Sequence, residues 1–256
     1  MKVGVRLTSL QGPLRKAVQT AGRTGAAGVQ LDAAGELLPN QLSQTGRRAF
    51  RNLLRGYNLE VTALGCPMRR GLNVAENLEV RLNHVRAVMS LAVDLGPRLV
   101  LIEVGKVGTD PAADATLGEA LLTLARFGDT NGVVLALETG KENAATVAGF
   151  LDRFDTGALA VNFDPAELLT HGFDPYQAVA ALCNRLAHVH CKDARPASAS
   201  PAGAEVLLGR GDLDWRRLVE LLRAADYRGW LTIESANAPL TAAQAAAGAT
   251  FLKQLL

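Results

Sequence analysis

The sequence predicts an α/β fold consisting of a single (β/α)8 TIM barrel over residues 1–256. Eight short apolar runs alternate with longer amphipathic segments along the chain, and Gly, Pro, Asn and Asp gather where they meet. This alternation is typical of parallel βαβ units. Eight such units in a chain of 256 residues match a closed barrel better than an open doubly wound sheet.

The predicted strands are runs of four to eight residues rich in Val, Leu and Ile. They cover residues 2–7, 28–32, 59–64, 98–104, 133–138, 158–163, 186–191 and 229–234. The clearest helix covers 76–95, where apolar residues recur every three or four positions and form one buried stripe. Further helices are predicted over 11–24, 40–56, 115–127, 143–154, 175–184, 214–225 and 240–255. We expect the polar segment 194–203 to be an excursion within one loop, since it is too short for a hinge between domains.

The amino-acid composition indicates which kinds of binding partner the protein lacks. The chain is 48% hydrophobic and 20% charged, as in an ordinary globular protein, and its 27 basic and 25 acidic residues leave a formal net charge of +2. Such a balance gives no basic footprint for a nucleic acid. The three cysteines are far apart and odd in number, no signal-like segment opens the sequence, and no apolar run approaches a membrane span. We expect a cytoplasmic protein that binds neither nucleic acid nor membrane, and we leave homo-oligomerisation open.

Four ligand-type side chains stand at the ends of four consecutive predicted strands. They are Glu138, Asp164, His190 and Glu234. In a TIM barrel the carboxyl ends of the strands form the face that carries catalytic groups, so these side chains should converge. Three carboxylates and one imidazole form a hard, oxygen-rich set. This set favours one divalent ion, with Mn²⁺, Mg²⁺ or Co²⁺ preferred over Zn²⁺ because no thiolate takes part.

The stretch LAHVHCKDAR places His188 and His190 on alternate positions, so both point the same way in a strand. We expect His188 to lie one layer deeper and to support the ligands or simply fill the core. Asn162, inward beneath Asp164, is expected to orient that carboxylate. Candidate substrate-binding cations are Arg6, Lys192 and Arg210, for which an ordinary solvated surface position is the alternative.

Four motifs carry a resemblance to a known family. They are LETGKE with Glu138, VNFDPAELL with Asp164, HVHCKD with His190, and LLGRGDLDW followed by YRGWLTIE with Glu234. Together they resemble the sugar-phosphate isomerase/epimerase family, whose barrels are similar to xylose isomerase. The resemblance covers nearly the whole chain and is most specific in its second half. It implies that Glu138, Asp164, His190 and Glu234 bind one divalent metal, and that the two glutamates also transfer protons.

The sequence departs from that family at two positions. Relatives often carry a histidine three residues after the aspartate of strand six, where this chain has Glu167, which we assign to the substrate-binding set. The epimerases also carry a glutamate six residues after the strand-five ligand, where this chain has Ala144. The metal site is therefore better supported than any one reaction.

The sequence predicts a divalent-metal-dependent isomerase or epimerase. Its substrate would be a small-molecule carbohydrate, namely a sugar or a sugar-like polyol. Proton transfer would proceed through a metal-stabilised enediolate. A metal-dependent lyase, dehydratase or hydrolase on the same barrel is the alternative, and a non-catalytic barrel is a third. A nuclease similar to endonuclease IV is disfavoured, because it needs several metals, more than four histidines and a basic face.

Overall fold

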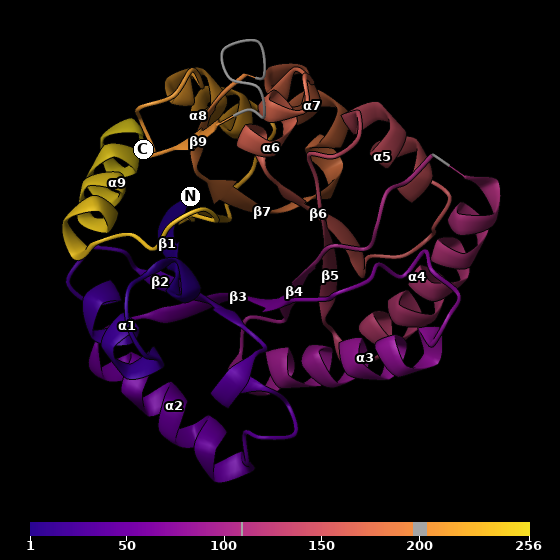
Figure 1. Ribbon diagram of the computed structural model, residues 1–256, viewed down its shortest axis with the longest axis horizontal. Coiled ribbons are helices and arrows are strands. Elements are labelled where there is room, and N and C mark those ends of the chain that lie inside the picture. Colours follow the sequence, from indigo (N-terminus) through magenta and orange to yellow (C-terminus); the bar gives the residue numbers. More distant parts are fainter. Residues whose placement is uncertain (109, 197–203) are drawn as a thin grey trace.

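Eight parallel strands close into a barrel with helices around its outside (Figure 1). The structure is a computed structural model and describes residues 1–108, 110–196 and 204–256. The strands are β1 (Lys2–Arg6), β2 (Gly28–Asp32), β3 (Glu60–Cys66), β4 (Leu99–Ile102), β5 (Val134–Glu138), β6 (Leu159–Phe163), β7 (Leu186–Cys191) and β10 (Trp230–Ile233). Each pairs with its neighbours in sequence order, and β10 pairs with β1 to close the ring. The predicted TIM barrel is confirmed.

Helices lie between the strands, and all of them except α6 correspond to predicted segments. They are α1 (Leu14–Ala21), α2 (Gln44–Gly56), α3 (Leu78–Leu95), α4 (Pro111–Asn131), α5 (Ala144–Leu151), α6 (Pro165–Thr170), α7 (Pro175–Leu182), α8 (Trp215–Ala224) and α9 (Ala242–Leu255). Helix α4 starts before the predicted 115–127 because the Asp110 side chain accepts a hydrogen bond from the Ala112 N–H (3.1 Å) and Pro111 suits the first turn. Within the described ranges, no helix is both long and apolar enough to span a membrane.

Two small elements depart from the sequence prediction. Helix α6 begins directly after β6, and an antiparallel pair of short strands, β8 (Asp193–Arg195) and β9 (Ala204–Val206), follows β7. The predicted loop excursion 194–203 is therefore partly strand at its start, while its residues 197–203 lie outside the described part of the chain. The buried Asp193 carboxylate explains this order, because it accepts hydrogen bonds from the N–H groups of Ala194 (2.9 Å) and Gly209 (3.0 Å). The described residues also contain three short 3₁₀ turns: η1 (Leu7–Ser9), η2 (Gly35–Leu37) and η3 (Cys183–Arg185).

The strands bury apolar residues both toward the helices and toward the inside of the barrel, and the cluster facing the helices is much larger. Val100 and Ile102 of β4 belong to the large cluster that the strands form with the helices. Leu99 and Leu101, which alternate with them, belong instead to a small separate cluster with three alanines from β3, β5 and β6. The alternation places this small cluster inside the barrel. The rest of the buried interior is polar and includes Gln30, Asn162, His188 and Thr232, so the barrel supplies hydrogen-bonding groups beneath its mouth.

Candidate active site

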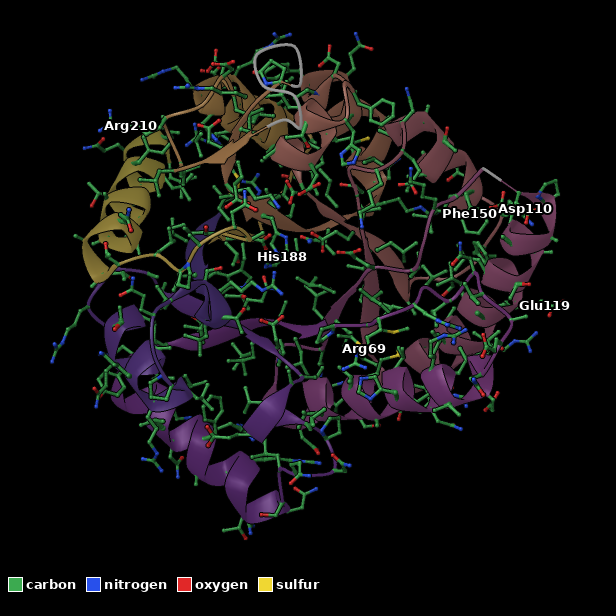
Figure 2. All side chains as sticks on the ribbon, in the orientation of Figure 1. Arg69, Asp110, Glu119, Phe150, His188 and Arg210 are labelled. Carbon is green, nitrogen blue, oxygen red and sulfur yellow. The ribbon has the colours of Figure 1, made fainter. Side chains whose placement is uncertain are left out.

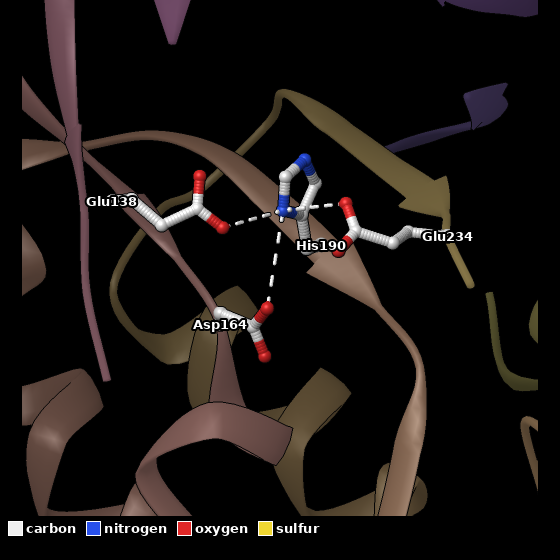
Figure 3. A group of neighbouring side chains, drawn as sticks. All are labelled: Glu138, Asp164, His190 and Glu234. Carbon is white, nitrogen blue, oxygen red and sulfur yellow. Dashed lines mark hydrogen bonds and ion pairs between the residues drawn. The ribbon is translucent and has the colours of Figure 1, made fainter. Parts of the chain in front are cut away.

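The four predicted ligand residues come together at the carboxyl ends of β5, β6, β7 and β10 (Figure 3). Each offers one ligand atom, and these atoms all lie within 4.8 Å of one another. His190 Nδ1 is 3.0 Å from Glu138 Oε1 and 3.0 Å from Glu234 Oε2. Asp164 Oδ2 is 3.9 Å from the same nitrogen. Strand β5 ends at Glu138, His190 is the penultimate residue of β7, and Asp164 and Glu234 directly follow β6 and β10, so barrel closure brings the four together.

Asp164 has two oxygens in different surroundings. Its Oδ1 caps α6 by accepting hydrogen bonds from the N–H groups of Ala166 (3.1 Å) and Glu167 (2.9 Å). Its Oδ2 is buried and accepts no hydrogen bond from the described residues, although Lys192 Nζ lies 3.0 Å away in an ion pair of poor hydrogen-bond direction. Burial raises the pKa of Asp164 to about 7. A buried carboxylate oxygen without a hydrogen bond, beside two more carboxylates and an imidazole, fits a divalent cation.

The His190 ring is held from its far side. Its Nε2 lies 2.8 Å from Gln30 Oε1 and donates its proton there, which turns Nδ1 toward the three carboxylates. Burial by itself lowers the pKa of His190, but Glu234 and Glu138 outweigh it and raise the pKa to about 10. Without metal, the ring is therefore a cation that balances the carboxylates. Sequence reasoning missed Gln30, although Gln30 and Asp32 occupy alternate positions of a strand and so signal a polar inner face.

A chain of hydrogen bonds supports the site from below, and Figure 2 shows His188 near the centre of the barrel. His188 Nδ1 lies 2.9 Å from Asn162 Oδ1, and His188 Nε2 lies 2.8 Å from Thr232 Oγ1. Burial lowers the pKa of His188 well below 6.5, so the neutral ring donates to Asn162 and accepts from Thr232. Asn162 Nδ2 then donates to Glu138 Oε2 (3.1 Å). Asn162 thus orients Glu138 and not the expected Asp164, because Asn162 is the register partner of Glu138 and Asp164 is engaged in the helix cap.

Two cations flank Glu234. Arg6 Nη1 donates to Glu234 Oε2 (3.0 Å) while the rest of its guanidinium forms a fork with Asp32 at 2.8 and 3.0 Å. Lys192 Nζ lies 3.1 Å from Glu234 Oε1 and 3.0 Å from Glu167 Oε1. Burial acts to raise the pKa of Glu234, but His190, Lys192 and Arg6 hold it well below its usual range. Glu234 is therefore a firmly charged carboxylate.

A cavity of about 350 Å³ opens above these groups. Most of the predicted residues line it, namely Arg6, Glu138, Glu167, His190, Lys192 and Glu234. Arg210 does not: it is exposed and lines a separate depression beside α9, and Figure 2 shows it toward the periphery. Arg210 follows a turn at Gly209 (φ +79°), its N–H donates to Leu207 O, and its depression borders the cavity at Glu234. The cavity rim also contains Glu103, Lys141 and Glu142, which sequence reasoning did not assign.

A family model for the xylose isomerase-like TIM barrel matches residues 18–255. The chain belongs to the xylose isomerase-like TIM barrel family. This family agrees with the resemblance carried by the four sequence motifs.

Solved structures of this fold superpose over the whole chain. A xylose isomerase domain protein from Planctomyces limnophilus aligns with a TM-score of 0.86 at 23% identity, covering 99% of this chain and 96% of that one. A D-allulose 3-epimerase from Methylomonas sp. aligns with a TM-score of 0.79 at 21% identity, covering 100% and 98%. At these identities the similarity concerns the fold.

The curated relatives match a shorter part of the chain. An inosose dehydratase from Clostridium botulinum is 27% identical over 114 residues. The match covers 40% of this chain and 38% of that enzyme.

Proposed function

We propose that this protein is a divalent-metal-dependent enzyme that isomerises or epimerises a sugar or sugar-like polyol by proton transfer at the barrel mouth. The observation that carries the proposal is the cluster of four ligand atoms within 4.8 Å of one another. The cluster borders a cavity of about 350 Å³, which lies at the small end of the range for ligand sites. The D-allulose 3-epimerase with the same fold supports a sugar substrate.

Glu138, Asp164, His190 and Glu234 would hold the metal ion. Their three carboxylates and one imidazole suit Mn²⁺, Mg²⁺ or Co²⁺. When bound, a divalent ion polarises a carbonyl oxygen and stabilises the negative charge that develops as a proton leaves the neighbouring carbon. Gln30 keeps the His190 ring oriented for this role, and the α6 cap keeps one Asp164 oxygen turned inward.

The two glutamates approach from opposite sides of His190, as Figure 3 shows. They differ in their partners. Glu138 contacts the neutral Asn162 amide and keeps 20% of its side chain exposed, whereas Glu234 is ion-paired with Arg6 and Lys192 and is 3% exposed. Because permanent cations weaken a carboxylate as a base, Glu138 is the stronger candidate for proton abstraction. Glu234 would accept or return the proton on the other face.

A dehydratase is the second candidate, and the match to inosose dehydratase favours it. Both reactions begin with removal of a proton next to a carbonyl group, so Glu138 would have the same role. Dehydration additionally needs an acid for the departing hydroxyl group. The buried Lys192 ammonium, which lines the cavity, is the candidate donor.

The test is exchange of substrate hydrogen with solvent deuterium. Metal-loaded protein and chelator-treated protein are incubated in D₂O with a panel of ketoses and inososes, and the products are followed by NMR. We expect metal-dependent exchange at the carbon next to the carbonyl group, which Glu138→Gln slows by roughly 10²–10⁴-fold. The spectrum of the product separates an epimer or isomer from a dehydrated ketone. Failure of every compound to exchange with metal bound would refute the proposal.

A further inference from the structure

Each basic side chain that lines the cavity within the described ranges is already paired with a carboxylate. Arg6 pairs with Asp32 and Glu234. Lys192 pairs with Asp164, Glu167 and Glu234. Lys141 pairs with Glu103. We propose, building on the proposed function, that the site accepts a neutral, unphosphorylated sugar or polyol and discriminates against its phosphate ester.

The charge of the cavity wall carries this inference. Three basic and six acidic side chains line the cavity, and the carboxylate of Asp164 lies directly behind them. The two positive charges of a divalent ion reduce this acidic excess without reversing it. A phosphate monoester would bring about two further negative charges at neutral pH. Unless it displaced a carboxylate from Arg6, Lys141 or Lys192, it would meet uncompensated like charge, which is how a site rejects the wrong ligand.

Other cations of the described residues do not line this cavity. Arg69 and Arg70 lie past β3 in a separate depression that meets the mouth at Met68, and Figure 2 labels Arg69. Arg70 is already paired with Glu76, and Arg81 donates to backbone carbonyl groups. By sequence, position 109 and positions 197–203 contain no Lys, Arg or His. The exposed Lys106, which adjoins the cavity-lining Gly105, and the exposed Arg69 are therefore the alternative partners for a phosphate group.

The cavity does offer partners for hydroxyl groups. Glu142 accepts one hydrogen bond from the Val107 N–H (3.1 Å) through Oε1, and its second oxygen has no partner among the described residues. Glu167 contacts Lys192 through Oε1 and lines the cavity. Carboxylate oxygens accept hydrogen bonds from hydroxyl groups, and a neutral polyol presents several of them. The wall therefore suits a hydroxyl-rich neutral ligand.

Binding of matched ligand pairs tests the inference. Metal-loaded protein, freed of excess metal, is titrated calorimetrically with D-fructose and D-fructose 6-phosphate, and with D-ribulose and D-ribulose 5-phosphate. We expect each neutral sugar to bind at least about tenfold more tightly than its ester at low ionic strength, with a narrower gap at higher salt. Glu103→Gln releases Lys141 at the rim and should shift the affinity ratio toward the ester by about fivefold. The matched control is Glu76→Gln, which releases Arg70 outside the cavity and should leave the ratio unchanged.

The outcomes separate this inference from the proposed function. If a phosphate ester binds as tightly as the corresponding neutral sugar, the inference is wrong, but the proposed function is not contradicted. If Arg69→Ala or Lys106→Ala then removes the affinity for the ester, the replaced side chain is the partner of the phosphate group. Absence of binding by all four compounds, extended to inositols and inososes, refutes the proposed function and the inference with it.

Discussion

Arg6 and Glu234 are 228 residues apart in the chain, yet Arg6 Nη1 donates to Glu234 Oε2 across 3.0 Å. The two residues lie at the ends of the first and last barrel strands, β1 and β10, which pair directly. The same guanidinium also holds Asp32 at the end of β2. The Arg6 side chain therefore links the two strands that close the barrel and also stabilises the charged form of a candidate catalytic carboxylate.

Replacement of Arg6 by Met should destabilise the fold by about 2 kcal/mol, because it leaves the buried Asp32 carboxylate without a cation and removes one of the cations beside Glu234. Urea denaturation measures the loss. The matched control is Lys2→Met on the same strand, which removes an exposed pair with Glu60 and should cost less than about 1 kcal/mol. Equal losses in the two variants would show that Arg6 stabilises the contact between β1 and β10 no more than an exposed ion pair does.

Metal should stabilise the folded protein by mass action. At a free metal concentration of one hundred times Kd, we expect about 2.7 kcal/mol, seen as a rise in Tm. His190→Ala should abolish most of this rise because it removes a ligand atom. The control is His188→Ala, which lies below the site and should lower Tm with and without metal while keeping the metal-induced rise. The opposite pattern would mean that His188, and not His190, is the ligand.

Metal binding at pH 7.5 should release roughly one proton, chiefly from His190, whose pKa is about 10 in the metal-free protein. The raised pKa of His190 stabilises the metal-free fold below pH 6.5, and this contribution is lost as the pH rises to about 10. The pKa of Asp164 is raised from 3.8 to about 7. Asp164 therefore also stabilises the metal-free fold at low pH, and this contribution is lost as the pH rises from about 4 to about 7. Stabilisation by metal should therefore grow with pH. Calorimetry in two buffers of different ionisation enthalpy measures the proton, and identical heats in both would contradict the prediction.

Glu138→Gln should reduce turnover by roughly 10²–10⁴-fold at saturating metal, because the amide keeps one ligand oxygen but cannot take up a proton. Glu234→Gln should retain more hydrogen exchange than product formation, if Glu234 acts on the second face. Rates of exchange and of product formation, measured in the same sample, separate the two steps. Normal turnover in both variants would leave the glutamates as ligands only, with a metal-activated water as the better mechanism.

Asp164→Asn and Asp164→Ala should differ in the metal-free protein. Asparagine retains an oxygen that caps α6, whereas alanine loses it at a cost of about 1 kcal/mol. Both variants lose the anionic ligand, so both should bind metal much more weakly. The Tm of each variant without metal measures the contribution of the helix cap. A metal titration of each variant measures its affinity for the metal ion. If the Asn variant unfolds as easily as the Ala variant, the cap contributes little to folding.

Much of the fold followed from local pattern. The apolar runs located the barrel strands, and the strand ends located Glu138, Asp164, His190 and Glu234, because parallel strands of a barrel finish on one face. Helix α6 was missed although Asp164, Pro165 and Glu167 form a helix-start signal, since six residues are too few for a periodic pattern. The β8–β9 pair was missed because its order depends on hydrogen bonds from a distant turn to Asp193.

Other features arise only when the barrel closes. The contact of Gln30 with His190 joins residues 160 positions apart, and no local pattern predicts which inner polar residue meets which. The same holds for Asn162, whose partner depends on the register of β5 and β6. Arg210 stands close in sequence to the mouth, but it lines a separate depression beside α9.

The double role of Asp164 restricts the sequences that this barrel can explore. One short side chain must present an acceptor to the first turn of α6 and an anionic oxygen to the mouth. Asparagine meets only the first demand, and glutamate is not among the preferred helix caps, so either substitution is penalised in folding or in chemistry. Glu138 and Glu234 carry no such cap. New activities on this scaffold should therefore arise first by drift at those two strand ends and at the rim, with the aspartate position as the last to vary.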